Sequence, residues 1–368
     1  MEGSCAASQK QKANASDGFS RFIRQLADRF IPAKPGPIAG PFTSTLEIRY
    51  SYSIFTMSTV KKYLSLIKFS HTIFALPFAM IGFVMGLMRA GSTVDPYALQ
   101  PLPNVILNDA NYLHIYSTRE LVLKFMLVLG CMIFARSAAM AFNRYLDRHF
   151  DALNPRTAIR EIPAGILKAN HVLWFTIISS VLFVVCCWFI NRLCFFLSPV
   201  ALFVILFYSY TKRFTPLCHL VLGLGLSLAP IGAYLAVTGQ FALLPILFSF
   251  TVIFWVSGFD IIYALQDEEF DKSKQLYSIP AWLGKAKGLR VSELLHLLSA
   301  ACVILAGVLG HFHWMYWVGV AIFVSMLLYQ HSIVKPTDLR RVNLAFMTAN
   351  GIASVVFAVF VITDLLIG

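Results

Sequence analysis

The sequence predicts an all-helical protein that crosses a membrane several times. Mean hydropathy is +0.71, 58% of the residues are apolar and only 13% are charged, values that exclude an ordinary soluble domain. The apolar stretches are continuous and close to the ~20 residues that a helix needs to span a bilayer, and none alternates as an outer-membrane strand would. We therefore expect an all-α polytopic membrane protein with nine transmembrane helices bundled around a central cavity.

Residues 1–56 form a polar N-terminal extension rich in Ser, Pro and Gly. It contains no apolar core of the length of a secretory signal, so we expect no cleaved signal peptide. Apolar residues at helical spacing alternate with arginines between residues 19 and 30, a pattern that suits a helix on an anionic membrane surface. The alternatives are a disordered tail, a start codon placed too early with Met57 as the true start, and a mitochondrial transit peptide.

Nine apolar spans follow within a single domain, residues 57–368. Their expected bounds are about 70–89, 121–142, 171–190, 193–210, 217–237, 241–265, 292–310, 313–333 and 343–367. A polar insertion, residues 90–118, separates the first two spans. It contains Asp95, Pro96, Pro101, Pro103 and Asp109 and is expected to be an extended loop.

The basic residues are distributed unequally between the two sides of the membrane. The net charge of +12 would suggest a nucleic-acid partner in a soluble protein, but here 18 Lys and Arg fall in the connections on one side and only three on the other. Because the basic side of a membrane protein stays in the cytoplasm, we expect the connections after the second, fourth and sixth spans to be cytoplasmic. The predicted location is the bacterial inner membrane with the active site facing the cytoplasm, or alternatively an organelle inner membrane.

A first row of polar side chains continues from the second span. Asn143, Asp147 and Asp151 stand four residues apart, and each such step along an α-helix advances about 6 Å and turns only about 40°. The three side chains are therefore expected to form one stripe on a helix, which we call the first acidic stripe.

A second acidic stripe follows the sixth span. Asp267 and Asp271 are again four residues apart, and Asp260 lies two turns earlier on the same expected face. Eight of the chain's 18 acidic residues lie in the two short segments 143–161 and 260–271. Such a concentration in an apolar chain indicates a site rather than a solvated surface.

Carboxylates at this spacing on two helices can converge on Mg²⁺, which is commonly shared with substrate phosphates. Basic residues that could hold the remaining phosphate oxygens stand near both stripes, namely Arg144, Arg148, Arg156, Arg160, Lys212, Lys272 and Lys274. Arg136 lies inside the second span on the face of the first stripe, and a charge in that position is expected to be functional because it is costly in a bilayer.

These residues resemble the aspartate-rich motifs of the UbiA-type intramembrane aromatic prenyltransferases. Asp267 and Asp271 resemble the second motif. The first is resembled by Asn143, Asp147 and Asp151, followed by Arg156, Thr157, Arg160, Pro163 and Gly165. Tyr208 and Lys212 resemble the tyrosine and lysine motif after the fourth helix. The family usually has Asp directly after the Asn of the first motif, whereas Arg144 stands there in this chain.

The resemblance implies Mg²⁺-dependent transfer of a polyprenyl chain from polyprenyl diphosphate to an aromatic hydroxy acid in quinone biosynthesis. It implies a metal site made by Asn143, Asp147, Asp151, Asp267 and Asp271, and substrate binding by Asn143, Arg156, Arg160, Tyr208 and Lys212. We expect catalytic roles for Asp147, Asp267 and Arg136. The segments FSHTIFALPFA and YSIPA are most similar to the futalosine-route menaquinone branch, which favours a dihydroxynaphthoate acceptor over 4-hydroxybenzoate.

The main alternative function is an ion or proton-coupled transporter that uses the acidic stripes. A transporter would place its charges near the bilayer midplane, whereas these stripes begin where spans end. A non-catalytic membrane scaffold would leave the pairing of the stripes unexplained. Six of the seven cysteines lie in or beside apolar runs without a CxxC pair and are expected to be structural thiols.

Overall fold

The computed structural model describes residues 59–67, 74–90 and 117–367, and these residues are almost entirely helical. The only β-type pairing among them is an isolated bridge between Lys335 and Asp338. The predicted N-terminal extension, residues 1–56, and nearly all of the insertion at 90–118 lie outside the described residues. The all-α prediction is confirmed for the rest of the chain.

The described helices follow the order of the predicted spans. They are α3 (Thr59–Leu66), α4 (Leu76–Ala90), α5 (Thr118–Leu153), α6 (Ala169–Ile190), α7 (Arg192–Thr211), α8 (Cys218–Thr238), α9 (Leu243–Ala264), α10 (Glu268–Ser273), α11 (Ile279–Leu309), α12 (Trp314–Ile333) and α13 (Asn350–Ile367). A 3₁₀ turn, η3 (Leu265–Asp267), precedes α10, and a π-helix, η4 (Leu344–Ala349), precedes α13.

Eight helical segments among the described residues are long and apolar enough to cross a membrane. The protein is therefore an integral membrane protein. The predicted number of nine spans is not confirmed, because α4, at the place of the first span, is a shorter apolar helix of 15 residues.

Helix α5 is longer than the span predicted at 121–142. Ser117 and Glu120 form a capping box at its start, and the helix runs for 36 residues to Leu153. Asn154 ends it in an extended conformation, directly before Pro155. The whole first acidic stripe therefore lies on one continuous helix, as the spacing predicted.

Helix α11 begins 13 residues before the span predicted at 292–310. Ser278 caps its first turn by accepting a hydrogen bond from the backbone of Ala281, and Pro280 stands in that turn, where proline is well tolerated. Gly284, with φ of +79°, kinks the helix in a conformation that glycine adopts readily. The Ser278 cap and Pro280 therefore allow α11 to begin at Ile279, within a polar segment that hydropathy did not include in the predicted span.

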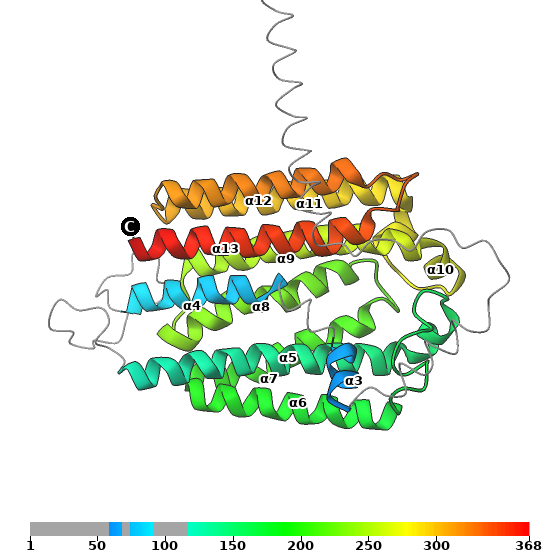
Figure 1. The fold of residues 1–368 in the computed structure, drawn as a ribbon, viewed down its shortest axis with the longest axis horizontal. Coiled ribbons are helices and arrows are strands. Elements are labelled where there is room, and N and C mark those ends of the chain that lie inside the picture. The colour runs from blue at the N-terminus through cyan, green and yellow to red at the C-terminus, as the bar shows by residue number, and fades with distance from the viewer. Residues whose placement is uncertain (1–58, 68–73, 91–116, 368) are drawn as a thin grey trace, which may run out of the picture. The chain divides into compact units, whose positions relative to one another are not determined.

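Helices α8 and α9 lie at the centre of the packing, where α8 contacts α4, α7 and α9, and α9 contacts α11. Glycines allow two of these close approaches: a Cβ on Gly82 would lie 2.0 Å from the carbonyl oxygen of Pro230, and one on Gly223 would lie 2.5 Å from that of Ile253. Figure 1 shows that α10 and the C-terminal end of α5 lie at the same end of the helices. This end brings the two predicted motifs together.

A buried polar network joins α9, α11, α12 and α13. Trp255 Nε1 and Gln330 Nε2 each donate to Asn350 Oδ1 at 2.8 Å. His296 Nδ1 lies 2.8 Å from His331 Nε2, and His296 Nε2 lies 3.3 Å from the carbonyl oxygen of Trp255. These contacts give each of the five side chains at least one hydrogen-bond partner inside the helix bundle, as buried polar groups in a bilayer require.

Candidate active site

Bases from two other segments hold the carboxylates of the first acidic stripe. Arg213, directly after α7, donates to Asp147 Oδ1 at 2.9 Å, and Arg160 donates to Asp151 Oδ1 at 2.6 Å. Asn143 Nδ2 donates to Asp147 Oδ2 at 3.0 Å, so the first two members of the stripe are in contact. The helical spacing therefore produces the predicted row of oxygen atoms.

The second stripe does not lie on one uninterrupted α-helix. Asp267 ends the 3₁₀ turn η3 and Asp271 lies in α10. Lys212 Nζ lies 2.7 Å from Asp271 Oδ1, and Ser278 Oγ donates to Asp271 Oδ2 at 2.9 Å. Arg156 donates to both carboxylate oxygens of Asp267.

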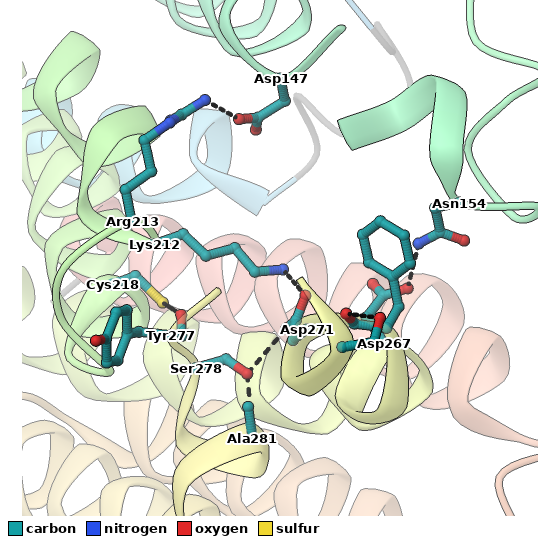
Figure 2. Close-up of polar contacts among 12 residues, drawn as sticks. Asp147, Asn154, Lys212, Arg213, Cys218, Asp267, Asp271, Tyr277, Ser278 and Ala281 are labelled. Carbon is teal, nitrogen blue, oxygen red and sulfur yellow. Dashed lines mark hydrogen bonds and ion pairs between the residues drawn. The ribbon is translucent and has the colours of Figure 1, made fainter. Parts of the chain in front are cut away.

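Two connections join the stripes into one site. Lys212 and Arg213 are consecutive residues, and each binds a carboxylate from a different stripe, as Figure 2 shows. The segment after the first stripe also reaches the second, because Asn154 Nδ2 donates to Asp267 Oδ1 at 3.2 Å beside the contact from Arg156. The carboxylates of both stripes therefore lie at the same end of the helices within one network of charges.

Asp260 has a different partner from the other acidic residues. Its Oδ2 lies 2.6 Å from Nδ1 of His219 in α8, a contact between α9 and α8. The sequence placed Asp260 on the face of Asp267 and Asp271, but the change to a 3₁₀ turn at Leu265 breaks the helical register between them.

An apolar cavity of about 380 Å³ lies among α5, α6, α7 and α8. Arg136 and Tyr208 are among its few polar lining residues. Arg136 precedes Asn143 by two turns of α5, and Tyr208 precedes Lys212 by one turn at the end of α7. Both side chains therefore line the part of the cavity wall that leads toward the acidic stripes.

Three cysteines, Cys131, Cys187 and Cys194, also line the cavity, and Sγ of Cys131 lies 3.7 Å from Sγ of Cys187. All six described cysteines are free, as the sequence predicted.

The remaining basic candidates divide into two groups. Arg144 is 4% exposed, its charge interacts with those of Asp151 and Glu161, and its Nε has no hydrogen-bond partner. Arg148 instead donates to the carbonyl of Tyr145, and Lys272 binds Glu268, one turn earlier in α10. Of these three, only Arg144 interacts with a carboxylate of the acidic stripes.

The bases that follow the spans stay charged. Burial disfavours the ammonium form of Lys212, but the adjoining Asp271 carboxylate outweighs burial and raises the pKa of Lys212 above its ordinary value. Burial likewise opposes the charge of Arg156, while hydrogen bonds to Asp267 raise the pKa of Arg156. Both side chains are therefore cations at neutral pH.

The oxygen donors of the stripes fit a magnesium ion that is shared with a substrate. Within the described residues, no three acidic, histidine or cysteine side chains are placed to hold one ion by themselves. Each stripe instead offers two carboxylates, and Oδ2 of Asp151 is buried without a hydrogen-bond partner. Mg²⁺ usually takes one or two carboxylates and completes its shell with water and phosphate oxygens, which matches this donor set.

Four residues of the site were not singled out from the sequence. Arg213 follows Lys212 directly, and Asn154 lies three residues after Asp151, the last member of the first stripe. Tyr263 lies four residues before Asp267, and its hydroxyl accepts a hydrogen bond of 2.9 Å from Arg156. Ser278 lies seven residues after Asp271. Helical spacing could have found Asn154 and Tyr263. Ser278 lies across a loop from its partner, and no spacing rule indicates it.

Comparison with known proteins gives a consistent result. Residues 112–352 match the UbiA prenyltransferase family. A 4-hydroxybenzoate octaprenyltransferase of Francisella tularensis subsp. mediasiatica is 28% identical over 70% of this chain and 86% of that protein. One of Tolumonas auensis is 29% identical over 61% of this chain and 78% of that protein.

Solved structures show the same fold. The apo structure of a UbiA homologue from Aeropyrum pernix has a TM-score of 0.63 and 26% identity, over 81% of this chain and 97% of that one. A UbiA homologue from Archaeoglobus fulgidus bound to GPP and Mg²⁺ has a TM-score of 0.61 and 18% identity, over 83% of this chain and all of that one.

Proposed function

The chain belongs to the UbiA prenyltransferase family, and we propose that it transfers a polyprenyl chain from a polyprenyl diphosphate to an aromatic hydroxy acid within the bilayer. The observation that carries the proposal is the junction at Lys212 and Arg213, where adjacent bases bind carboxylates from both acidic stripes. A diphosphate is the ligand that such a mixed set of carboxylates and bases accepts when a divalent ion accompanies it.

The metal ligands would be the side chains of Asn143, Asp147, Asp151, Asp267 and Asp271. The Archaeoglobus fulgidus homologue is bound to Mg²⁺ together with a prenyl diphosphate, which supports the same pairing in this chain. When bound, Mg²⁺ would neutralise the negative charge that develops on the departing diphosphate.

The basic residues would bind the diphosphate oxygens. Arg156 and Arg160 follow the first stripe and Lys212 ends α7, and each now neutralises one carboxylate. The planar guanidinium groups of Arg156 and Arg160 and the compact ammonium group of Lys212 can exchange their carboxylate partners for phosphate oxygens. The carboxylates are then available to bind the metal. The three bases thus orient the leaving group and stabilise its charge.

The apolar cavity would hold the polyprenyl chain. Its wall consists mostly of aliphatic side chains of α5 to α8, so the allylic carbon next to the diphosphate would lie in a water-poor environment. Exclusion of water protects an allylic cation from hydrolysis until the aromatic ring attacks it.

Arg136 and Tyr208 are the residues proposed to orient the aromatic acceptor. Both line the cavity, and a guanidinium there can pair with the acid group of the acceptor. We expect Arg136→Ala to raise the KM for the acceptor at least tenfold with a smaller effect on that for the diphosphate, since a charge-assisted hydrogen bond contributes about 1.5–3 kcal/mol. Equal increases in both constants would contradict this role.

The catalytic domain is proposed to comprise residues 57–368, with both stripes on the cytoplasmic side of a bacterial inner membrane. The excess of basic residues in the connections that carry the stripes supports this orientation. Labelling with a membrane-impermeant thiol reagent tests this orientation, with single cysteines placed at residues 274 and 311. In intact cells the reagent should label the cysteine at 311 and not the cytoplasmic one at 274.

A product assay tests the reaction itself. Purified full-length protein, Mg²⁺ and one limiting polyprenyl diphosphate are incubated with equal concentrations of 4-hydroxybenzoate and a dihydroxynaphthoate, and the products are identified by mass. The names of the relatives favour 4-hydroxybenzoate, whereas the FSHTIFALPFA and YSIPA segments favour the dihydroxynaphthoate, which we expect to dominate. Absence of any prenylated product would contradict the proposed reaction.

A further inference from the structure

His219, near the start of α8, is a buried polar side chain that links three helices. Its Nδ1 lies 2.6 Å from Oδ2 of Asp260 in α9, and its Nε2 accepts a hydrogen bond of 3.3 Å from the backbone N–H of Ile279, the first residue of α11. The carbonyl of His219 accepts from Ser257 Oγ at 3.0 Å. The side chain is only 3% exposed, and the proposed reaction does not use it directly.

The two contacts define the tautomer of His219. A backbone N–H can only donate, so Nε2 must present its lone pair to Ile279. The ring proton is then on Nδ1, where it is donated to the Asp260 carboxylate. Asp260 therefore fixes the orientation of an imidazole whose other nitrogen accepts the Ile279 N–H, the arrangement by which carboxylates orient histidines at metal sites.

Residues 277–279 form a connecting segment that is anchored at both ends. At one end, Tyr277 donates its N–H to the carbonyl of Lys212 at 2.7 Å, and its carbonyl accepts from Cys218 Sγ at 3.6 Å. At the other end, Ile279 donates to His219. The position of the segment is thus determined by the end of α7 and the start of α8.

Ser278, at the middle of this segment, touches the acidic site. Its hydroxyl donates to Asp271 Oδ2 at 2.9 Å and accepts from the backbone N–H of Ala281 at 3.2 Å (Figure 2). Because the Ala281 N–H can only donate and the Asp271 carboxylate can only accept, the hydroxyl proton of Ser278 is directed to the carboxylate. The place of Ser278 therefore determines the orientation of Asp271, which is completely buried.

We propose that His219 is a positioning residue of the prenyl-transfer site, which acts through the 277–279 segment on the Asp271 carboxylate. The inference rests on the proposed function, since it takes Asp271 to bind the metal and diphosphate. Loss of the acceptor on His219 leaves the buried N–H of Ile279 unsatisfied. The segment then moves toward another acceptor, and Ser278 no longer holds Asp271 in position.

The test uses Mn²⁺ as a probe for Mg²⁺, with inorganic diphosphate and purified full-length protein in detergent. Free Mn²⁺ is measured by electron paramagnetic resonance, a readout that does not depend on turnover. His219→Asn keeps a donor for Asp260 but does not reach Ile279, and its Kd for Mn²⁺ should rise about tenfold, as for other losses of supporting contacts at metal sites. His219→Gln can place its amide oxygen where Nε2 lies, and its Kd should stay near that of the natural protein.

A double variant tests the route of the effect. Ser278→Ala alone should weaken Mn²⁺ binding roughly tenfold. His219→Asn combined with Ser278→Ala should bind no more weakly than Ser278→Ala alone, because both changes act through one hydroxyl. If His219→Asn does not fold, Ile279→Pro removes the same hydrogen bond from its donor side and should give the same weakening. Proline suits the first helical position, and Ser278 before it is already extended, with φ of −150° and ψ of 159°.

His296 provides the matched control because it is as buried as His219, at 3% exposure, and its ring bonds to Trp255 and His331 rather than to a carboxylate or to the 277–279 segment. His296→Asn should lower the unfolding temperature and leave the Kd for Mn²⁺ unchanged. Normal Mn²⁺ affinity in folded His219→Asn, or an additive loss in the double variant, would overturn the inference alone. A natural protein that bound no Mn²⁺ with diphosphate would overturn the proposed function along with it.

Discussion

The two acidic stripes use the same residue type at the same spacing, yet the structure supports them differently. The first lies on the uninterrupted helix α5, whereas the second passes from the 3₁₀ turn η3 into the short helix α10. The side chain of Asp147 is 25% exposed, whereas that of Asp271 is fully buried. A single helix backbone therefore aligns the first stripe, whereas the alignment of the second depends on a turn and on contacts from other segments.

The difference follows from the cost of burying charge. A carboxylate that retains access to water needs little help, but a fully buried one must be paired and hydrogen-bonded. Asp271 has both Lys212 and Ser278 for this purpose, and Asp267 has Arg156 and Asn154. Asp271 should therefore be more sensitive than Asp147 to substitution of its partners.

The largest expected effect comes from removing a carboxylate from either stripe. Asp147→Ala and Asp267→Ala should each lower turnover by at least about a hundredfold, because loss of metal-assisted charge stabilisation costs several kcal/mol. Turnover is measured by product mass at saturating Mg²⁺, and detergent size-exclusion profiles confirm folding. Near-normal turnover in either variant would exclude that residue from the metal site.

The next effect distinguishes the two adjacent bases. Lys212→Ala should destabilise the protein by about 1–3 kcal/mol, because it leaves the buried Asp271 with Ser278 as its remaining polar partner. Arg213→Ala should cost less than about 1 kcal/mol, since Asp147 keeps contact with solvent and with Asn143. Denaturant titrations of both variants give the comparison. A larger loss of stability in Arg213→Ala than in Lys212→Ala would show that burial of the carboxylate does not determine how much each ion pair contributes.

The sequence predicted the first stripe more completely than the second. Four-residue spacing after an apolar span is sufficient to place Asn143, Asp147 and Asp151 on one helix face, and the composition is sufficient to predict the all-helical membrane fold. For Asp260, Asp267 and Asp271 the same spacing rule assumes a continuous α-helix, which the 3₁₀ turn interrupts.

Contacts between segments were beyond the reach of spacing rules. Arg213, Ser278 and His219 act on carboxylates 66, 7 and 41 residues away in the chain, respectively. Such partners are determined by how helices pack and where connections cross, which depends on close approaches such as that at Gly223. The sequence could therefore indicate the chemistry of the site, while its supporting residues required the structure.

A smaller effect is expected from Asn154, which supports the second stripe from the C-terminal end of α5. Its side chain donates to Asp267 Oδ1 at 3.2 Å and accepts from the backbone N–H of Arg156 at 3.0 Å. Asn154→Ala should cost about 1 kcal/mol of stability and weaken diphosphate binding severalfold. Asn154→Asp should be worse, because it adds a like charge beside Asp267, and calorimetry with diphosphate and Mg²⁺ measures both. Equal behaviour of the two variants would mean that Asn154 does not act on that carboxylate.

The smallest effect concerns pH and the pairing of Lys212 with Asp271. Although burial opposes the charge, the carboxylate raises the pKa of Lys212 above its ordinary value of 10.5. A raised pKa in the folded protein gives a stabilisation that is fully present below the unfolded value and is lost only as the pH rises through the folded one. The difference in unfolding temperature between the natural protein and Lys212→Ala should therefore be the same at pH 6 and pH 9. A difference that shrinks by pH 9 would mean that Lys212 releases its proton in the folded protein at a lower pH, and that burial outweighs the Asp271 carboxylate in setting the pKa of Lys212.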